Sequence, residues 1–367
     1  MTFPDILTIC MVLFMFVGVL DHISGNHFGL GEQFLEGFRA FGSLAVTMTG
    51  VLVLLPYRET WLGPALTAVC SVFGMDPAML TGIFLACDMG GLPLAQSLAT
   101  TPEGVGLGGL ILGSMMGANI VFNIPVALGV IPREDRRAMS RGVLCGFIAI
   151  PAGCFFGGLT AGYSAAAVLW HLLPVIVIAL VIALLLWLVP EGITKAFLLF
   201  GKVISILSAL AAALAIGQSL TGFRILPGLG DIREAMDLVV NIVLVLPGAY
   251  VMVTLLSRLL AKPFRKIGAL LQINETSTLG LLTTIANAVP TFGLIRDMDE
   301  RGKVLNFAFL VSAGYMLGDH LAFCSAMLPE MVLPMVVGKF TGGICGLLLA
   351  LVLTGRKPGS ENKHQQI

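Results

Sequence analysis

The chain alternates between long apolar runs and short segments that are polar or rich in glycine and proline. The apolar runs fall near 5–21, 38–56, 61–74, 78–98, 105–131, 139–162, 165–189, 196–219, 236–257, 262–273, 276–296, 303–328 and 331–354. A helix needs about 20 apolar residues to cross a bilayer, and only the third and tenth runs are clearly too short. The pattern predicts an all-α polytopic membrane protein with about 11–13 helical segments.

Composition agrees with a membrane protein. Of the 367 residues, 57% are hydrophobic and 11% are charged, whereas soluble domains carry roughly 25% charged residues. A membrane β-barrel would show short segments of alternating polarity instead. The formal net charge is zero, so the charge balance does not favour a nucleic-acid partner. The seven cysteines fall inside apolar runs without a C-x-x-C pair, which predicts packing roles, no metal site and no cofactor.

The sequence resembles itself at an offset of about 200 residues, a hallmark of secondary transporters. Matching pairs include Gly18 and Gly217, Pro64 and Pro263, Asp76 and Glu275, Asp88 and Asn287, and Gly146 and Gly346. Chance alignment of glycine-rich apolar segments is the alternative, and the near-constant offset argues against it. We therefore divide the chain into repeat one at 1–164, a connecting transmembrane helix at 165–195, repeat two at 196–354 and a polar tail at 355–367.

The charged loops predict that the two repeats have opposite orientations. Basic residues crowd 258–266, 133–141 and 296–303, whereas the equivalent loops of the other repeat, such as the one at Arg58 and Glu59, carry few charges. Basic loops face the cytoplasm, which places the C-terminus in the cytoplasm. This topology requires the short runs 61–74 and 262–273 to cross or half-cross as well.

Two carboxylates interrupt apolar runs. Asp88 is the only charge in 81–94, and Asp319 precedes His320 inside 303–328. Each acid at the bilayer centre costs roughly 2.5–3.5 kcal/mol, so each needs a partner or a role in a substrate path. The alternative is a helix-packing contact to a hydroxyl or an amide. Glycine and proline follow both Asp88 and its repeat mate Asn287, which predicts interrupted helices around a transport site.

Further polar residues have helical spacing beside these acids. Asn119 and Asn123 are four residues apart, so they share a face and need either polar substrate groups or another helix as partners. Tyr315, Asp319 and Phe323 have the same spacing and predict an aromatic–carboxylate–aromatic stripe suited to an organic cation. The neighbouring His320 is a candidate for a proton-linked site, or for a hydrogen-bonded helix contact.

Four short motifs resemble the ethanolamine permease family of bacterial ethanolamine-utilisation operons. They are 86–91 (ACDMGG), 112–117 (LGSMMG), 124–129 (IPVALG) and 317–321 (LGDHL). The resemblance runs over nearly the whole chain and includes polar as well as apolar positions. It implies a multi-pass protein of the bacterial inner membrane that transports ethanolamine.

The resemblance and the residues lead to one hypothesis. Ethanolamine is mostly a cation at neutral pH, since the comparable amine of lysine has a pKa of about 10. Asp88 would bind the ammonium, and Asp319 would be a second anionic or proton-linked contact. The three asparagines, Asn119, Asn123 and Asn287, would bind the hydroxyl and cap the broken helices. An ion-coupled carrier for another small polar solute is one alternative, and a membrane enzyme using Asp319 and His320 is another. The chain has no metalloprotease motif such as H-E-x-x-H, and we predict no enzyme. The sequence leaves open the driving force and whether copies of the chain associate.

Overall fold

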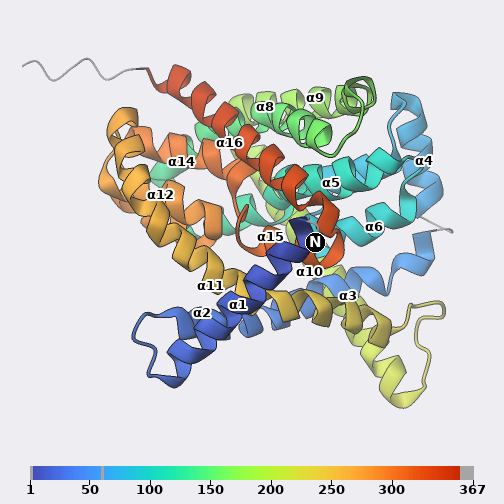
Figure 1. Cartoon of the computed structure of the whole chain (residues 1–367). Helices are drawn as coiled ribbons and strands as arrows, with labels where there is room; N and C mark the ends of the chain where they lie inside the picture. The colour runs from blue at the N-terminus through green and yellow to red at the C-terminus, as the bar shows by residue number, and fades with distance from the viewer. Residues whose placement is uncertain (1–2, 59–61, 356–367) are drawn as a thin grey trace, which may run out of the picture.

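A computed structural model describes residues 3–58 and 62–355 (Figure 1). Its α-helices are α1 (Phe3–Ile23), α2 (Leu30–Arg39), α3 (Phe41–Leu52), α4 (Leu62–Phe73), α5 (Pro77–Phe84), α6 (Gly91–Leu98), α7 (Ile124–Val130), α8 (Arg136–Thr160), α9 (Ala165–Leu188), α10 (Pro190–Thr221), α11 (Ile232–Leu271), α12 (Glu275–Ala286), α13 (Ala288–Leu294), α14 (Glu300–Ala313), α15 (Asp319–Met327) and α16 (Val332–Thr354). The wider π-type helices are η3 (Gly104–Gly117) and η4 (Asn119–Asn123), and the short 3₁₀ turns include η2 (Cys87–Met89) and η5 (Arg133–Asp135). Glu59 and the tail beyond 355 lie outside the described residues, so predictions made for them are untested.

The prediction of an all-α polytopic membrane protein is confirmed. Within the described ranges, eight helices are long and apolar enough to cross a membrane. A ninth span is formed if the pair Leu66–Phe73 and Pro77–Phe84, bent by 105° at its break, counts as one. Most predicted runs coincide with one helix or with one interrupted pair of helices.

One predicted segment does not exist separately. The runs 236–257 and 262–273 form the single 40-residue helix α11, which continues through Pro247 and Pro263. Proline removes one backbone donor, but neighbouring helices can compensate for that loss in a membrane protein. At 1.5 Å per residue, α11 is about 60 Å long, roughly twice the hydrocarbon thickness of a bilayer. A separate crossing by 262–273 is therefore wrong, and the cytoplasmic placement of the C-terminus stays a prediction.

The helices α8 and α16 pack through glycines. A Cβ on Gly153 would lie 2.6 Å from the carbonyl oxygen of Gly338, and one on Gly346 would lie 3.3 Å from Cα of Gly146. Small residues at such positions let helix backbones approach closely in membranes. Figure 1 shows α16 crossing in front of α8 and α14, and all three helices contact one another.

Side-chain caps begin α5 and α12, the first halves of the two interrupted helices. Asp76 precedes α5 and accepts a hydrogen bond from the backbone N–H of Ala78 at 2.8 Å. Its second oxygen accepts from the backbone and hydroxyl groups of Thr100 and Thr101, at 2.7 to 2.9 Å. Burial alone would raise the pKa of Asp76, but these donors, above all Thr101, outweigh it and lower the pKa below its ordinary value.

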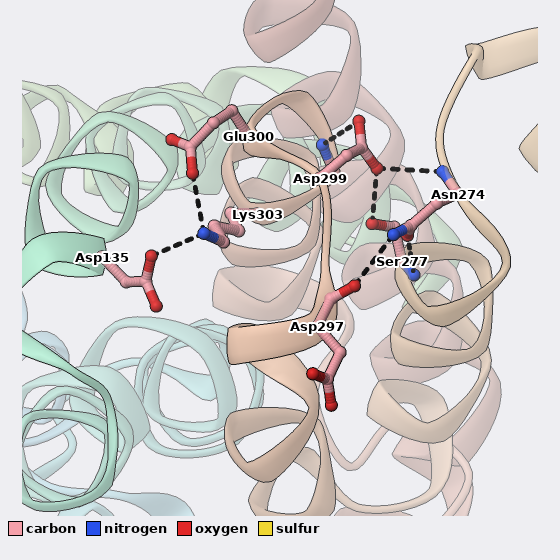
Figure 2. Close-up of polar contacts among 8 residues, drawn as sticks. Asp135, Asn274, Ser277, Asp297, Asp299, Glu300 and Lys303 are labelled. Carbon is pink, nitrogen blue, oxygen red and sulfur yellow. Dashed lines mark hydrogen bonds and ion pairs between the residues drawn. The ribbon is translucent and has the colours of Figure 1, made fainter.

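Helices α12 and α14 have an equivalent connection (Figure 2). Asn274 caps α12 by accepting from the backbone N–H of Ser277, and Asp299 caps α14 by accepting from Gly302. The Asp299 carboxylate also accepts from the backbone of Asn274 at 2.9 Å and from the Ser277 hydroxyl at 2.8 Å. In both places the start of the interrupted helix is thus tied to the loop before the next long helix. The inverted orientation and the domain limits 1–164, 165–195 and 196–354 stay predictions.

Candidate functional site

The first interrupted helix places Asp88 in a turn, as the sequence predicts. Helix α5 ends at Phe84, the backbone is extended at Leu85 and Ala86, and η2 then carries Asp88 before α6 begins. Gly90 follows with φ +89°, a conformation that glycine adopts without strain. A Cβ on Gly90 would also lie 2.5 Å from the side chain of Val51 in α3. Glycine therefore lets the chain turn tightly after Asp88 while α3 covers it.

The second interruption at Asn287 is also confirmed. Helix α12 ends at Ala286, and Asn287 has an extended backbone before α13 begins. The side chain of Asn287 accepts a hydrogen bond from the backbone N–H of Val289 at 2.9 Å. Asn287 thus caps the second half of the broken helix, which is one of the two roles predicted for it.

A third interruption is not predicted by the sequence. The apolar run 303–328 breaks between α14 and α15, where Tyr315 has φ +59°. The backbone N–H groups of Tyr315 and Leu317 donate to the carbonyls of Thr284 and Ile285, at 3.0 and 2.9 Å. These bonds replace those that a continuous helix would make, so the break is held by the neighbouring helix α12.

The breaks at η2 and before α15 bring the candidate acids together. His320 Nε2 lies 3.9 Å from the Asp88 carboxylate. Asp319, in the first turn of α15, accepts a hydrogen bond from the hydroxyl of Tyr250 in α11. Asp88 keeps 18% of its side chain exposed and Asp319 is half-buried, whereas His320 is 2% exposed. The breaks at η2 and before α15 therefore bring two partly exposed carboxylates toward each other.

The predicted aromatic–carboxylate–aromatic stripe is wrong in its geometry. Tyr315 lies in the break and not on α15, so it does not share a helical face with Asp319 and Phe323. Its ring packs against Phe122 at 6.3 Å and against His320 at 5.3 Å, measured between ring centroids. The aromatic hydroxyl that reaches Asp319 comes from Tyr250, and Phe323 is fully buried.

The two asparagines lie side by side, as their spacing predicts. The Asn123 amide donates to the Asn119 side-chain oxygen at 3.1 Å. Asn119 donates to the carbonyl of Val311 in α14 at 2.6 Å, and also to Met115. The Tyr315 hydroxyl donates to the Asn123 oxygen at 3.0 Å. The sequence left either substrate groups or another helix as partners, and Asn119 bonds to another helix. The hydrogen-bonded chain of Asn119 and Asn123 ends at Tyr315, whose ring contacts His320.

Two residues near the acids are missed by the sequence analysis. Tyr250 sits in the apolar part of α11, where no charged residue stands beside it. Lys339 is the only charged residue of α16, is 1% exposed, and donates to the carbonyl of Ser114 at 2.6 Å. A lone lysine inside an apolar run is a signal of the same kind as the two acids.

Three side chains could together coordinate a metal ion. The ligand atoms of Cys87, Asp88 and His320 lie within 4.8 Å of one another. His320 Nδ1 is buried with no hydrogen-bond partner among the described residues. The Lys339 ammonium bonds to the carbonyl of Ser114 in η3, the helix that packs against this turn, and its positive charge opposes a cation there. The predicted absence of a metal site stays a prediction.

Comparison with known proteins covers the whole chain. Residues 3–353 match the family described as "Ethanolamine utilisation protein, EutH". The "Probable ethanolamine permease EutH" of Listeria monocytogenes serotype 1/2a is 44% identical over 366 residues, covering 100% of this chain and 98% of that protein. The protein of the same name in Escherichia coli K12 is 39% identical over 399 residues, covering 98% of each chain. "Uncharacterized protein YxeR" of Bacillus subtilis is 35% identical over 364 residues, covering 99% of this chain and 98% of that protein. No solved structure matches.

Proposed function

Because the chain belongs to the EutH family of ethanolamine utilisation proteins, we propose that it carries protonated ethanolamine across the bacterial inner membrane. It would act as a secondary carrier or facilitator. Two of the three relatives reported above are named probable ethanolamine permeases and none is named as an enzyme, in agreement with the prediction that the chain is not an enzyme. The observation that carries the proposal is the convergence of Asp88 and Asp319 from two interrupted helices.

Asp88 would bind the ammonium group. An ammonium about 4 Å from a carboxylate gains roughly 4 kcal/mol at an effective dielectric of about 20, which offsets much of the cost of leaving water. The partial exposure of Asp88 leaves room for a ligand to approach. Asp319, held by Tyr250, would be a second anionic contact or a proton-linked site, and His320 would respond to the charge on Asp88.

The hydroxyl of ethanolamine would bind the amide chain. The Asn123 amide uses one hydrogen in its bond to Asn119 and has a second hydrogen to donate to the substrate. The Tyr315 hydroxyl bonds to Asn123, and the Tyr315 ring packs against His320. Asn119 would act by holding Asn123, since both of its own amide contacts go to backbone carbonyls. Asn287 would shape the second broken helix, and Phe323 would form an apolar wall behind Asp319.

Alternating access would come from movement of one repeat against the other. The contact between Gly146 and Gly346 joins positions 200 residues apart, which is what a pseudo-two-fold axis between the repeats would produce. Glycine-lined contacts between α8 and α16 would let the helices shift without side-chain interference. The oligomeric state and the driving force are left open by this proposal.

Uptake into proteoliposomes tests the proposed function. At mildly acidic pH the neutral amine is scarce, so the proposal predicts saturable uptake of labelled ethanolamine above that of empty liposomes. Ethylamine, which keeps the ammonium, should compete, whereas ethylene glycol, which keeps only hydroxyls, should not. Competition by ethylene glycol but not by ethylamine would contradict recognition of the cation. Ion-dependent uptake of a non-amine solute, with none of ethanolamine, would favour the alternative carrier.

A further inference from the structure

Lys339 is a buried cation that the proposed binding of substrate does not use. It lies in α16, its side chain is 1% exposed, and its ammonium donates to the backbone carbonyl of Ser114 in η3 at 2.6 Å. A lysine enclosed by helices is strongly disfavoured unless an acceptor or an opposite charge stabilises it. A single neutral carbonyl is weak compensation for a full charge, so other partners must contribute.

The position of Ser114 places the lysine beside the Asp88 turn. Gly113 precedes Ser114 and Gly117 lies about one turn after it. Both glycines pack directly against the residues between α5 and η2. A Cβ on Gly113 would lie 3.3 Å from the backbone nitrogen of Cys87, and one on Gly117 would lie 2.0 Å from the carbonyl oxygen of Leu85. Helix η3 therefore places the carbonyl that receives the Lys339 ammonium alongside the break that holds Asp88.

A carrier that binds a cation at a carboxylate has an unbalanced negative charge when it is empty. After release of the substrate, the carboxylate must pass through the reorientation without its ammonium. An unpaired charge in a low-dielectric surrounding is costly, so reorientation of the empty carrier would be slow. Lysine carries the same chemical group as protonated ethanolamine, a primary ammonium, on a flexible four-carbon stem.

We propose that Lys339 is the resident cation of the Asp88 site, balancing the carboxylate whenever the substrate is absent and yielding to the substrate ammonium on binding. This inference rests on the proposed function and adds a role to the same site. Lys339 lies in repeat two and Asp88 in repeat one, so the pair also links the two parts that would move against each other. His320 is closer to Asp88 in the structure, but it is charged only when protonated.

Net uptake and exchange separate this role from a structural one. Net uptake requires the empty carrier to return, whereas exchange of internal for external ethanolamine uses only the loaded carrier. Lys339→Met keeps an unbranched side chain of similar length and removes the charge. We expect it to reduce net uptake at least about tenfold while exchange stays within about twofold of the intact protein. Lys339→Arg should restore most of the net uptake, and exposed Lys202, changed to Met, is the matched control.

Each outcome decides one claim. Equal rates of net uptake in Lys339→Met and Lys202→Met would overturn the resident-cation role and leave the proposed function standing. Loss of both net uptake and exchange in a monodisperse Lys339→Met protein would also overturn it, because the lysine would then be needed for carrying substrate at all. Failure of the intact protein to catalyse either process would instead refute the proposed function.

Discussion

The buried ion pair between α14 and η5 offers a quantitative test of the structure. Lys303 in α14 donates to Asp135 of η5 at 2.6 Å and to Glu300 at 2.7 Å (Figure 2). The side chains of Lys303 and Asp135 are 9% and 5% exposed, whereas that of Glu300 is 82% exposed. Asp135→Asn therefore removes the one carboxylate that is buried with the lysine.

The expected loss of stability follows from that asymmetry. Breaking a buried pair costs about 3–5 kcal/mol, because the remaining charge stays buried without its partner. Glu300 still reaches Lys303 but is screened by solvent, so we expect the lower end of that range, about 3 kcal/mol. Replacing both partners, Asp135→Asn with Lys303→Met, should cost less than Asp135→Asn alone, since no buried charge is then left unpaired.

Thermal unfolding of the detergent-purified protein measures these differences. Asp297→Asn is the matched control, because Asp297 is exposed and its backbone carbonyl, not its carboxylate, accepts the bond from Asn274 in Figure 2. We expect Asp135→Asn to lower the Tm clearly and Asp297→Asn to leave it nearly unchanged. Equal effects of the two substitutions, or a double variant less stable than Asp135→Asn, would refute the reasoning.

Three further predictions concern the caps, the amides and the glycines. The lowered pKa of Asp76 means that its stabilisation is present above the ordinary carboxyl pKa and is lost as pH falls through the folded pKa. Asp76→Asn should therefore lower the Tm at neutral pH and flatten its decline at acidic pH, and an unchanged Tm–pH curve would contradict this. Asn119→Ala should cost about 1–3 kcal/mol of stability by leaving the Val311 carbonyl without its side-chain donor and the Asn123 amide without its acceptor. Asn123→Ala should also lower the Tm, because the Tyr315 hydroxyl loses its acceptor, and it should weaken uptake more than Asn119→Ala does; the reverse ranking of the two uptake losses would exchange their roles. Gly153→Val should abolish monodisperse protein on size-exclusion chromatography, because its Cβ alone would lie 2.6 Å from a carbonyl oxygen of α16, whereas Gly217→Val, with nothing within 4 Å, should be tolerated.

The sequence predicts the parts of the fold that local chemistry determines. Apolar length identifies the spans, and the glycines and prolines after Asp88 and Asn287 identify two interrupted helices. These signals succeed because backbone at membrane depth must satisfy its own hydrogen bonds, so helix-breaking residues there mark real departures from a helix. The side-by-side placement of Asn119 and Asn123 follows from helical spacing in the same way.

What the sequence does not predict depends on partners far away in the chain. The break at Tyr315 has no proline, and it exists because backbone groups there bond to carbonyls of α12. The neighbouring residues Tyr250 and Lys339 reach the site only through tertiary packing, and the Ser114 carbonyl that receives Lys339 is 225 residues away. Spacing along one helix cannot show such contacts, which is why the aromatic stripe was assigned to Tyr315 instead of Tyr250.

The most direct test of the central claim is the uptake of labelled ethanolamine by Asp88→Asn at mildly acidic pH. Exposed Asp237, changed to Asn, is the matched control, and both variants are compared with the intact protein at equal amounts in the membrane. Loss of about 1.4 kcal/mol of ammonium binding is a tenfold change, so the account predicts that Asp88→Asn reduces uptake at low substrate concentration by at least about tenfold, and that Asp237→Asn does not. Uptake by Asp88→Asn equal to that of the intact protein would contradict the account and make Asp88 a structural residue.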